Sequence, residues 1–145
     1  MESEVKTIGI FLDTGFFFAL EFKKDPNHQR AYEILSEMAQ RKYGTQFTSD
    51  FIIDELMTLT WVRTENKNLI AQVWELITPP KNICNVIYVS QDDIIQIYNL
   101  FFKILESAKF LSFTDCSNLF MMQKFNLKHL ASFDSNFDGL TTRIY

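Results

Sequence analysis

The stretch Ile8-Gly9-Ile10-Phe11-Leu12-Asp13-Thr14-Gly15 decides the fold class of this chain. It begins with a short apolar run and stops at an acidic residue, after which Thr14 and Gly15 turn the chain. A continuous apolar run of this length is typical of a strand that is buried on both faces, as in a parallel sheet. We therefore expect a central parallel strand over 8–12, with Asp13 at its carboxyl end.

The remainder of the 145 residues alternates helical patterns with further short apolar runs. Strands are expected at 45–48, 85–89, 127–133 and 142–145, with helices between them. The expected helix starts are Asp25 followed by Pro26, Ser49, Ser90 with Asp93 in a capping box, and Thr114. The second helix is expected to end near Tyr43-Gly44. Alternating strands and helices predict one α/β domain over 1–145, a three-layer α/β/α sandwich with a mostly parallel sheet of four or five strands.

Composition excludes several other classes of protein. The net charge of −4 argues against a protein that coats nucleic acid by charge alone. Cys84 and Cys116 lack zinc-ligand spacing and are expected to be free and buried in a reducing compartment. Met1 to Lys6 has no apolar run, and no stretch is long enough to span a membrane, so we expect a cytoplasmic protein.

Four acids stand out by their places in this pattern: Asp13, Glu55, Asp115 and Asp134. Asp13 and Asp134 follow strands, Asp115 lies in the first turn of a helix, and Glu55 lies beside the apolar face of another. Taken singly, each acid also has a structural interpretation, as a helix-dipole partner, a turn residue or a solvent-facing side chain. Together they are expected to meet at the carboxyl edge of the sheet, where such folds place their sites.

Carboxylates that are brought together repel one another unless a cation binds between them. Hard oxygen ligands without His or Cys favour Mg²⁺ or Mn²⁺ over zinc. Metal ions held by carboxylates at an open rim are suited to the hydrolysis of phosphodiesters. The acids therefore predict a metal-dependent hydrolase.

At these residues the sequence resembles the PIN-domain nucleases, which include the toxins of bacterial and archaeal toxin–antitoxin pairs. The resemblance rests on four motifs in order, at 10–15, 48–56, 113–116 and 130–137. It covers essentially the whole chain and implies the strand order 3-2-1-4-5. It also implies a Mg²⁺- or Mn²⁺-dependent endoribonuclease that cuts RNA, with a small antitoxin as partner.

The family's site carries over to these positions one residue at a time. The resemblance assigns catalysis and metal binding to Asp13, Glu55, Asp115 and Asp134, with hydroxyl groups near the site at Thr14, Thr114 and Ser132. Asp138 is either a peripheral fifth acid or part of a plain turn with Gly139.

Two other functions compete with this one. A phosphatase of the haloacid-dehalogenase type needs a second Asp two residues after the first, and Gly15 stands there instead. A PIN-like domain that only binds RNA or protein remains the alternative, although all four acids are present.

The fifteen Phe residues include a dense group, Phe16-Phe17-Phe18 and Phe22, directly after Asp13. This group covers too much of a helix circumference for every ring to face one side. We expect a homodimer that buries part of this surface, extended by Tyr32, Trp61 and Trp74, with a peptide groove beside it. The alternative is that neighbouring helices of the same chain cover the rings.

Overall fold

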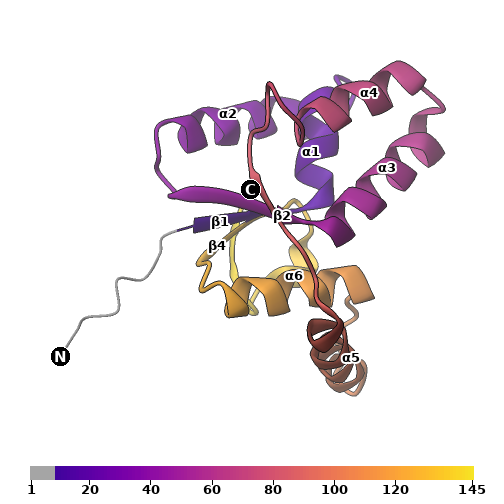
Figure 1. Cartoon of the computed structure of the whole chain (residues 1–145), viewed down its shortest axis with the longest axis vertical. Helices are drawn as coiled ribbons and strands as arrows, with labels where there is room; N and C mark the ends of the chain where they lie inside the picture. The colour runs from indigo at the N-terminus through magenta and orange to yellow at the C-terminus, as the bar shows by residue number, and fades with distance from the viewer. Residues whose placement is uncertain (1–8) are drawn as a thin grey trace.

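The computed structural model describes residues 9–145, and its centre is a five-stranded sheet in which every pairing is parallel (Figure 1). The strand order is β3-β2-β1-β4-β5, as the sequence predicts. The strands are β1 (Gly9–Leu12), β2 (Thr45–Ser49), β3 (Asn85–Ile87), β4 (His129–Ala131) and β5 (Thr142–Ile144). Met1 to Ile8, including the expected strand start at Ile8 and the N-terminal segment expected to lack a leader, lie outside the described residues.

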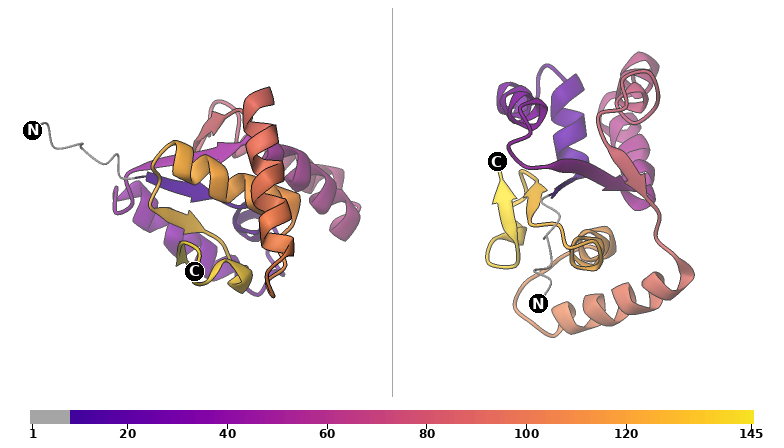
Figure 2. Two further views of the ribbon diagram at one scale, coloured as in Figure 1. Left: turned by 90° about the horizontal axis from the view of Figure 1, so that it is seen from below. Right: turned by 60° about the vertical axis from the view of Figure 1, so that its left-hand side comes forward.

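Helices cover both faces of the sheet and complete the three layers. Figure 2 shows α1 to α4 on one face and α5 and α6 on the other, with α6 between α5 and the sheet. The helices are α1 (Thr14–Glu21), α2 (His28–Ala39), α3 (Asp50–Thr64), α4 (Lys67–Glu75), α5 (Gln91–Leu105) and α6 (Phe113–Lys124), with a 3₁₀ turn, η1 (Ser135–Phe137). No helix within residues 9–145 combines the length and the apolar character needed to cross a membrane.

Strand β1 and helix α1 form the centre of the core. Every residue of β1 is buried, as the uninterrupted apolar run predicts. Phe16 and Phe17 are fully buried and Phe18 is 2% exposed, so α1 is enclosed by its own chain. The expectation that Phe16 to Phe18 form part of a surface for a second copy is therefore wrong. Phe22 is half-buried, and the other aromatic side chains of that expected surface are exposed: Tyr32, Trp61 and Trp74. Helix α1 packs against α2, α3 and α4.

Two expected helix boundaries are also wrong. Asp25 does not cap α2, because its side chain accepts a hydrogen bond from Asn27 N (2.8 Å) and forms a turn that contains Pro26. The helix begins only at His28. It ends at Ala39, before the expected Tyr43-Gly44, because Arg41 adopts a left-handed conformation with φ of 59°.

The start of α6 differs by two residues from its expected position. Ser112, and not Thr114, is the N-cap: its Oγ accepts from Asp115 N (3.0 Å), and Asp115 Oδ2 accepts from Ser112 N (3.0 Å). Thr114 is the second residue of the helix. The capping box predicted for Ser90 and Asp93 at the start of α5 is confirmed, and so is the cap at Ser49.

Candidate active site

Asp13 stands at the carboxyl end of the central strand and anchors the site. The register pairs Leu12 with Ala131, so Asp13 lies beside Ser132 at the same edge of the sheet. Asp13 Oδ2 accepts from Ser132 Oγ (2.7 Å), while Oδ1 accepts from Thr14 N (2.9 Å) and Asn118 Nδ2 (3.2 Å). Three donors from three separate elements therefore hold this carboxylate in one orientation.

Burial decides the protonation of Asp13. Desolvation raises its pKa from 3.8 to about 7, against the hydrogen bonds from Ser132 and from the Thr14 amide, which lower it. The neighbouring charges of Asp115 and Glu55 raise the pKa further, which means that these two carboxylates are close enough to repel Asp13. A cation bound beside Asp13 would therefore stabilise its ionised form and lower its pKa.

Asp115 contributes one oxygen to the helix cap and leaves the other for the site. Burial raises its pKa, the capping bonds to Ser112 lower it, and the charge of Asp134 raises it. Because Ser112 engages Oδ2, the capping box fixes the rotation of the Asp115 side chain. The same interaction therefore begins α6 and orients a carboxylate whose charge acts on Asp13.

Glu55 reaches the site from the second turn of α3. Burial raises its pKa, the Thr14 hydroxyl lowers it, and the charges of Asp115 and Asp54 raise it. Thr14 Oγ1 and Glu55 Oε2 are both buried, and neither has a hydrogen-bond partner of good geometry. The two groups are nevertheless close enough for the Thr14 hydroxyl to lower the pKa of Glu55. Asp54 itself is exposed.

Asp134 completes the set of four acids. It follows β4, and its amide donates to Ser132 Oγ (3.1 Å), so Ser132 links Asp134 to Asp13. One oxygen of Asp134 caps the turn η1 by accepting from Asn136 N (2.9 Å). The four acids predicted from the sequence therefore converge at the carboxyl edge of the sheet from four separate segments.

Two of the suggested supporting residues have hydrogen-bond partners outside the four acids. Asp138 is exposed and forms a bidentate ion pair with Arg143 (2.8 and 3.1 Å), with its backbone carbonyl bonded to Lys109. Thr114 is half-buried next to Asp115, and its backbone oxygen accepts from Ser117 Oγ. The structure gives Asp138 a structural partner in place of a position among the four acids.

Asn118 is a site residue that the sequence reasoning missed. Its side chain is fully buried, and Oδ1 has no hydrogen-bond partner while Nδ2 holds Asp13. One signal was available: Asn118 lies three residues after Asp115, on the same face of α6. A buried amide on the face that carries a predicted ligand is a candidate for contact with that site.

The donor set suits a hard divalent cation. Thr14 Oγ1, Glu55 Oε2 and Asn118 Oδ1 are buried oxygens without partners, and they surround carboxylates that repel one another. Within residues 9–145, however, no three His, Cys, Asp or Glu side chains gather closely enough to enclose one ion as they stand.

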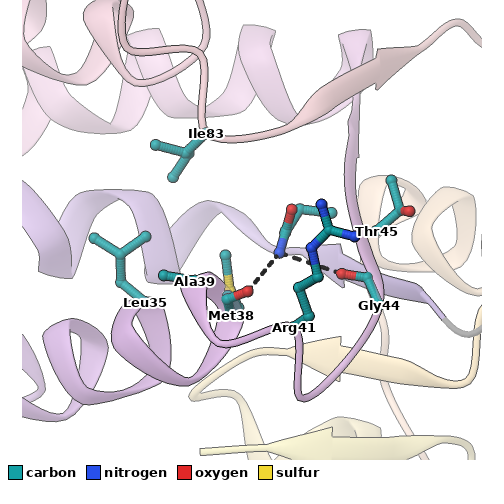
Figure 3. A pocket seen from close by; sticks show the side chains of 8 residues that line it. Leu35, Met38, Ala39, Arg41, Gly44, Thr45 and Ile83 are labelled. Atoms are coloured by element: carbon teal, nitrogen blue, oxygen red, sulfur yellow. Dashed lines mark hydrogen bonds between the residues drawn. The ribbon is translucent and has the colours of Figure 1, made fainter.

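A hollow elsewhere in the molecule is separate from the acids. It has a volume of about 540 Å³ and is lined by residues of α2 and by the start of β2, with Ile83 opposite (Figure 3). Gln46 closes one side by donating to the carbonyls of Met38 (3.2 Å) and Gly44 (3.3 Å). This hollow lies at the amino end of β2, whereas the acids lie at the carboxyl end of the sheet. It therefore plays no part in the candidate site.

Comparisons with known proteins agree with this geometry. The family model of the PIN domain matches residues 10–141. The chain is 29% identical over 126 residues to a VapC ribonuclease of Archaeoglobus fulgidus. These residues make up 87% of this chain and 77% of that protein.

Two solved structures share the fold at low sequence identity. VapC20 of Mycobacterium tuberculosis, a sarcin–ricin loop cleaving toxin, superposes with a TM-score of 0.75 at 21% identity, over 90% of this chain and 94% of that one. VapBC2 of Rickettsia felis, bound to a DNA fragment from its promoter, superposes with a TM-score of 0.66 at 13% identity. The match covers 94% of this chain and 97% of that one.

Proposed function

The chain belongs to the PIN domain family, and we propose that it is a Mg²⁺- or Mn²⁺-dependent endoribonuclease, the toxin of a toxin–antitoxin pair. The observation that carries the proposal is that Glu55 and Asp115 act on the buried Asp13, whose pKa is raised to about 7. Asp134 acts in turn on Asp115. Similarity to a VapC ribonuclease supports the choice of RNA as substrate.

In this proposal the contacts of each site residue decide its role. Bound divalent metal would supply an activated water and would stabilise the charge that develops on the phosphate. Asp13, Asp115 and Asp134 would hold the ions, and Ser132 keeps Asp13 oriented toward them. Glu55 has a free Oε2 with which it would hold a second ion or accept a proton from the attacking water.

The proposed partner is a small antitoxin protein. Its support is the fold shared with VapBC2 of Rickettsia felis and with FitAcB of Neisseria gonorrhoeae. We further propose that the protein acts in the cytoplasm, where the buried free thiols of Cys84 and Cys116 would stay reduced.

The direct test is RNA cleavage by the purified chain with Mg²⁺ or Mn²⁺, compared with the same reaction in excess chelator. We expect endonucleolytic products only when a divalent cation is present. Binding of RNA without any turnover, at every metal concentration tried, would contradict the proposal and favour the binding-module alternative.

The capping box of α6 provides a second test of the site. Ser112→Ala removes the hydroxyl that accepts from Asp115 N, which we expect to lower the free energy of unfolding by about 1 kcal/mol. It should also lower cleavage, roughly tenfold, because the Ser112 hydroxyl interacts with the Asp115 carboxylate as well, and the variant keeps only the backbone donor Ser112 N. Urea denaturation and initial cleavage rates measure the two effects.

Ser90→Ala is the matched control for this variant. Ser90 forms the same kind of capping box with Asp93 at the start of α5, away from the four acids. The control should lose similar stability and retain its activity. Equal losses of activity in the two variants would show that Ser112 acts only through stability.

A further inference from the structure

The first turns of α3 and α6 each carry an aromatic ring close to a residue of the candidate site. Phe51 is the second residue of α3, and Phe113 is the first residue of α6. The two helices pack against each other, and the ring centroids of Phe51 and Phe113 are 6.3 Å apart, with planes inclined by 32°. The two rings therefore form one small aromatic surface, which we call the ring pair.

The ring pair adjoins two of the four acids. Phe51 lies four residues before Glu55, so both side chains lie on one face of α3, about 6 Å apart along the helix axis. Phe113 precedes Asp115 by two residues in the first turn of α6. Glu55 and Asp115 are themselves close enough for the charge of Asp115 to raise the pKa of Glu55. The same two helix ends thus bring two acids and two rings together.

The two rings differ in how firmly the protein encloses them. Phe113 is half-buried and packs against the core, and the edge contact with Phe101 of α5 (centroids 5.6 Å apart, planes at 75°) supports its ring. Phe51 is also half-buried, but the apolar side chains of residues 9–145 that pack against the core do not include it. Phe51 therefore presents part of its ring to solvent on a fixed support, beside the acids.

Positive charge next to the acids is already engaged within the protein. Lys109 donates to the backbone oxygen of Asp138, and Arg143 forms a bidentate ion pair with the carboxylate of the same residue. The chain as a whole carries a net charge of −4. Apart from bound metal, this region therefore attracts a phosphate backbone weakly, and contacts with bases have to supply part of the affinity for RNA.

We propose that Phe51 is a base-stacking residue, which selects an unpaired nucleotide next to the bond that is cut. The proposal rests on the ribonuclease function proposed above. An unpaired base can stack on an aromatic ring, whereas a base within a duplex is held between its neighbours. Every base has a face that can stack, so this contact selects single-stranded RNA without fixing its sequence. Because Glu55 follows one turn later on the same face of α3, a base on Phe51 would bring an adjacent phosphate to the acids.

A purely structural role for Phe51 would make a different demand on the side chain. Packing depends on volume and apolar character, which Leu retains, whereas stacking depends on a flat aromatic face, which Tyr retains. The substitutions Phe51→Leu and Phe51→Tyr therefore separate the two roles.

The first experiment measures binding in the absence of cleavage. A short single-stranded oligoribonucleotide that carries the fluorescent base 2-aminopurine is titrated with the Asp13→Asn variant, and the position of the fluorescent base is changed in turn. Stacking on Phe51 should quench the fluorescence at one position. In the same background, Phe51→Leu should weaken binding about 10-fold and abolish the quenching, whereas Phe51→Tyr should recover most of both. A duplex of the same sequence should bind equally well with Phe and with Leu at position 51.

Cleavage by the otherwise unchanged chain gives a second readout. Phe51→Leu should raise KM for the single strand about 10-fold and change kcat less, and Phe51→Tyr should restore KM. Phe125→Leu is the matched control, since Phe125 is 38% exposed at the opposite end of α6 from Phe113. That variant should change neither KM nor the quenching.

The outcomes separate this proposal from the ribonuclease function on which it rests. Equal binding and equal quenching by the Leu and Tyr variants, with circular dichroism showing both folded, would overturn stacking even if every variant cleaves RNA. A wild-type chain that never cleaves, but whose binding still distinguishes Leu from Tyr at position 51, would support stacking and contradict the ribonuclease function.

Discussion

Asp13→Asn is expected to lower RNA cleavage at least about 10³-fold, the largest effect on activity of any single substitution in this chain. Asn is the same size as Asp and retains an oxygen that accepts from Thr14 N and Asn118 Nδ2, so the local fold should persist. The loss would come from the missing negative charge at the proposed metal site. Initial rates with Mn²⁺ under single-turnover conditions measure it.

The same substitution is expected to stabilise the metal-free protein above neutral pH. The pKa of Asp13 is about 7 in the folded state, against 3.8 for an ordinary aspartate, so the unfolded chain loses this proton at lower pH than the folded chain does. Between these values the folded protein binds more protons, and its stability falls as the pH rises. Asn cannot ionise, so the variant does not lose stability in this way, and its advantage in the free energy of unfolding should reach about 4 kcal/mol above pH 7.

Thermal unfolding as a function of pH and of Mn²⁺ tests this reasoning. Mn²⁺ should stabilise the wild type and have little effect on the variant, because Asn at position 13 removes the carboxylate at the centre of the proposed metal site. Asp138→Asn is a matched control, since Asp138 is an exposed acid paired with Arg143 and should be dispensable for cleavage. Full metal-dependent cleavage by Asp13→Asn would show that the site is assigned wrongly.

Ser132→Ala is expected to lower cleavage at neutral pH by about 10- to 100-fold. Ser132 Oγ donates to Asp13 Oδ2 at 2.7 Å and favours the ionised carboxylate, which lowers the pKa of Asp13. Without that donor the pKa of Asp13 rises. The acid limb of the pH–rate profile should therefore move to higher pH, and part of the activity should return in alkaline buffer.

Ser117→Ala provides the comparison for this variant. Ser117 is also a fully buried serine, but its hydroxyl donates to the backbone oxygen of Thr114 and not to Asp13. It should change stability without moving the pH profile. An unchanged acid limb in Ser132→Ala would exclude control of Asp13 by this hydrogen bond.

Sequence alone determined the fold class and the four acids of the candidate site. The apolar run that ends at Asp13, the alternation of strands and helices, and the capping box at Ser90 are local patterns. Each is set by interactions within a few residues along the chain, so each can be recognised without knowing what packs against it. Once parallel strands are expected, their carboxyl ends must meet at one edge, and this brings the acids together.

Only the tertiary structure showed that Asn118 holds Asp13, that the expected hydroxyl of Ser132 donates to it, and which surfaces stay exposed. Asn118 and Ser132 contact Asp13 across 105 and 119 residues of chain, through the pairing of β1 with β4 and the packing of α6. Periodicity shows that a side chain favours burial, but it does not show which element covers it. For that reason the rings of Phe16 to Phe18 are enclosed, while the rings of Tyr98 and Phe102 on α5 stay exposed to solvent.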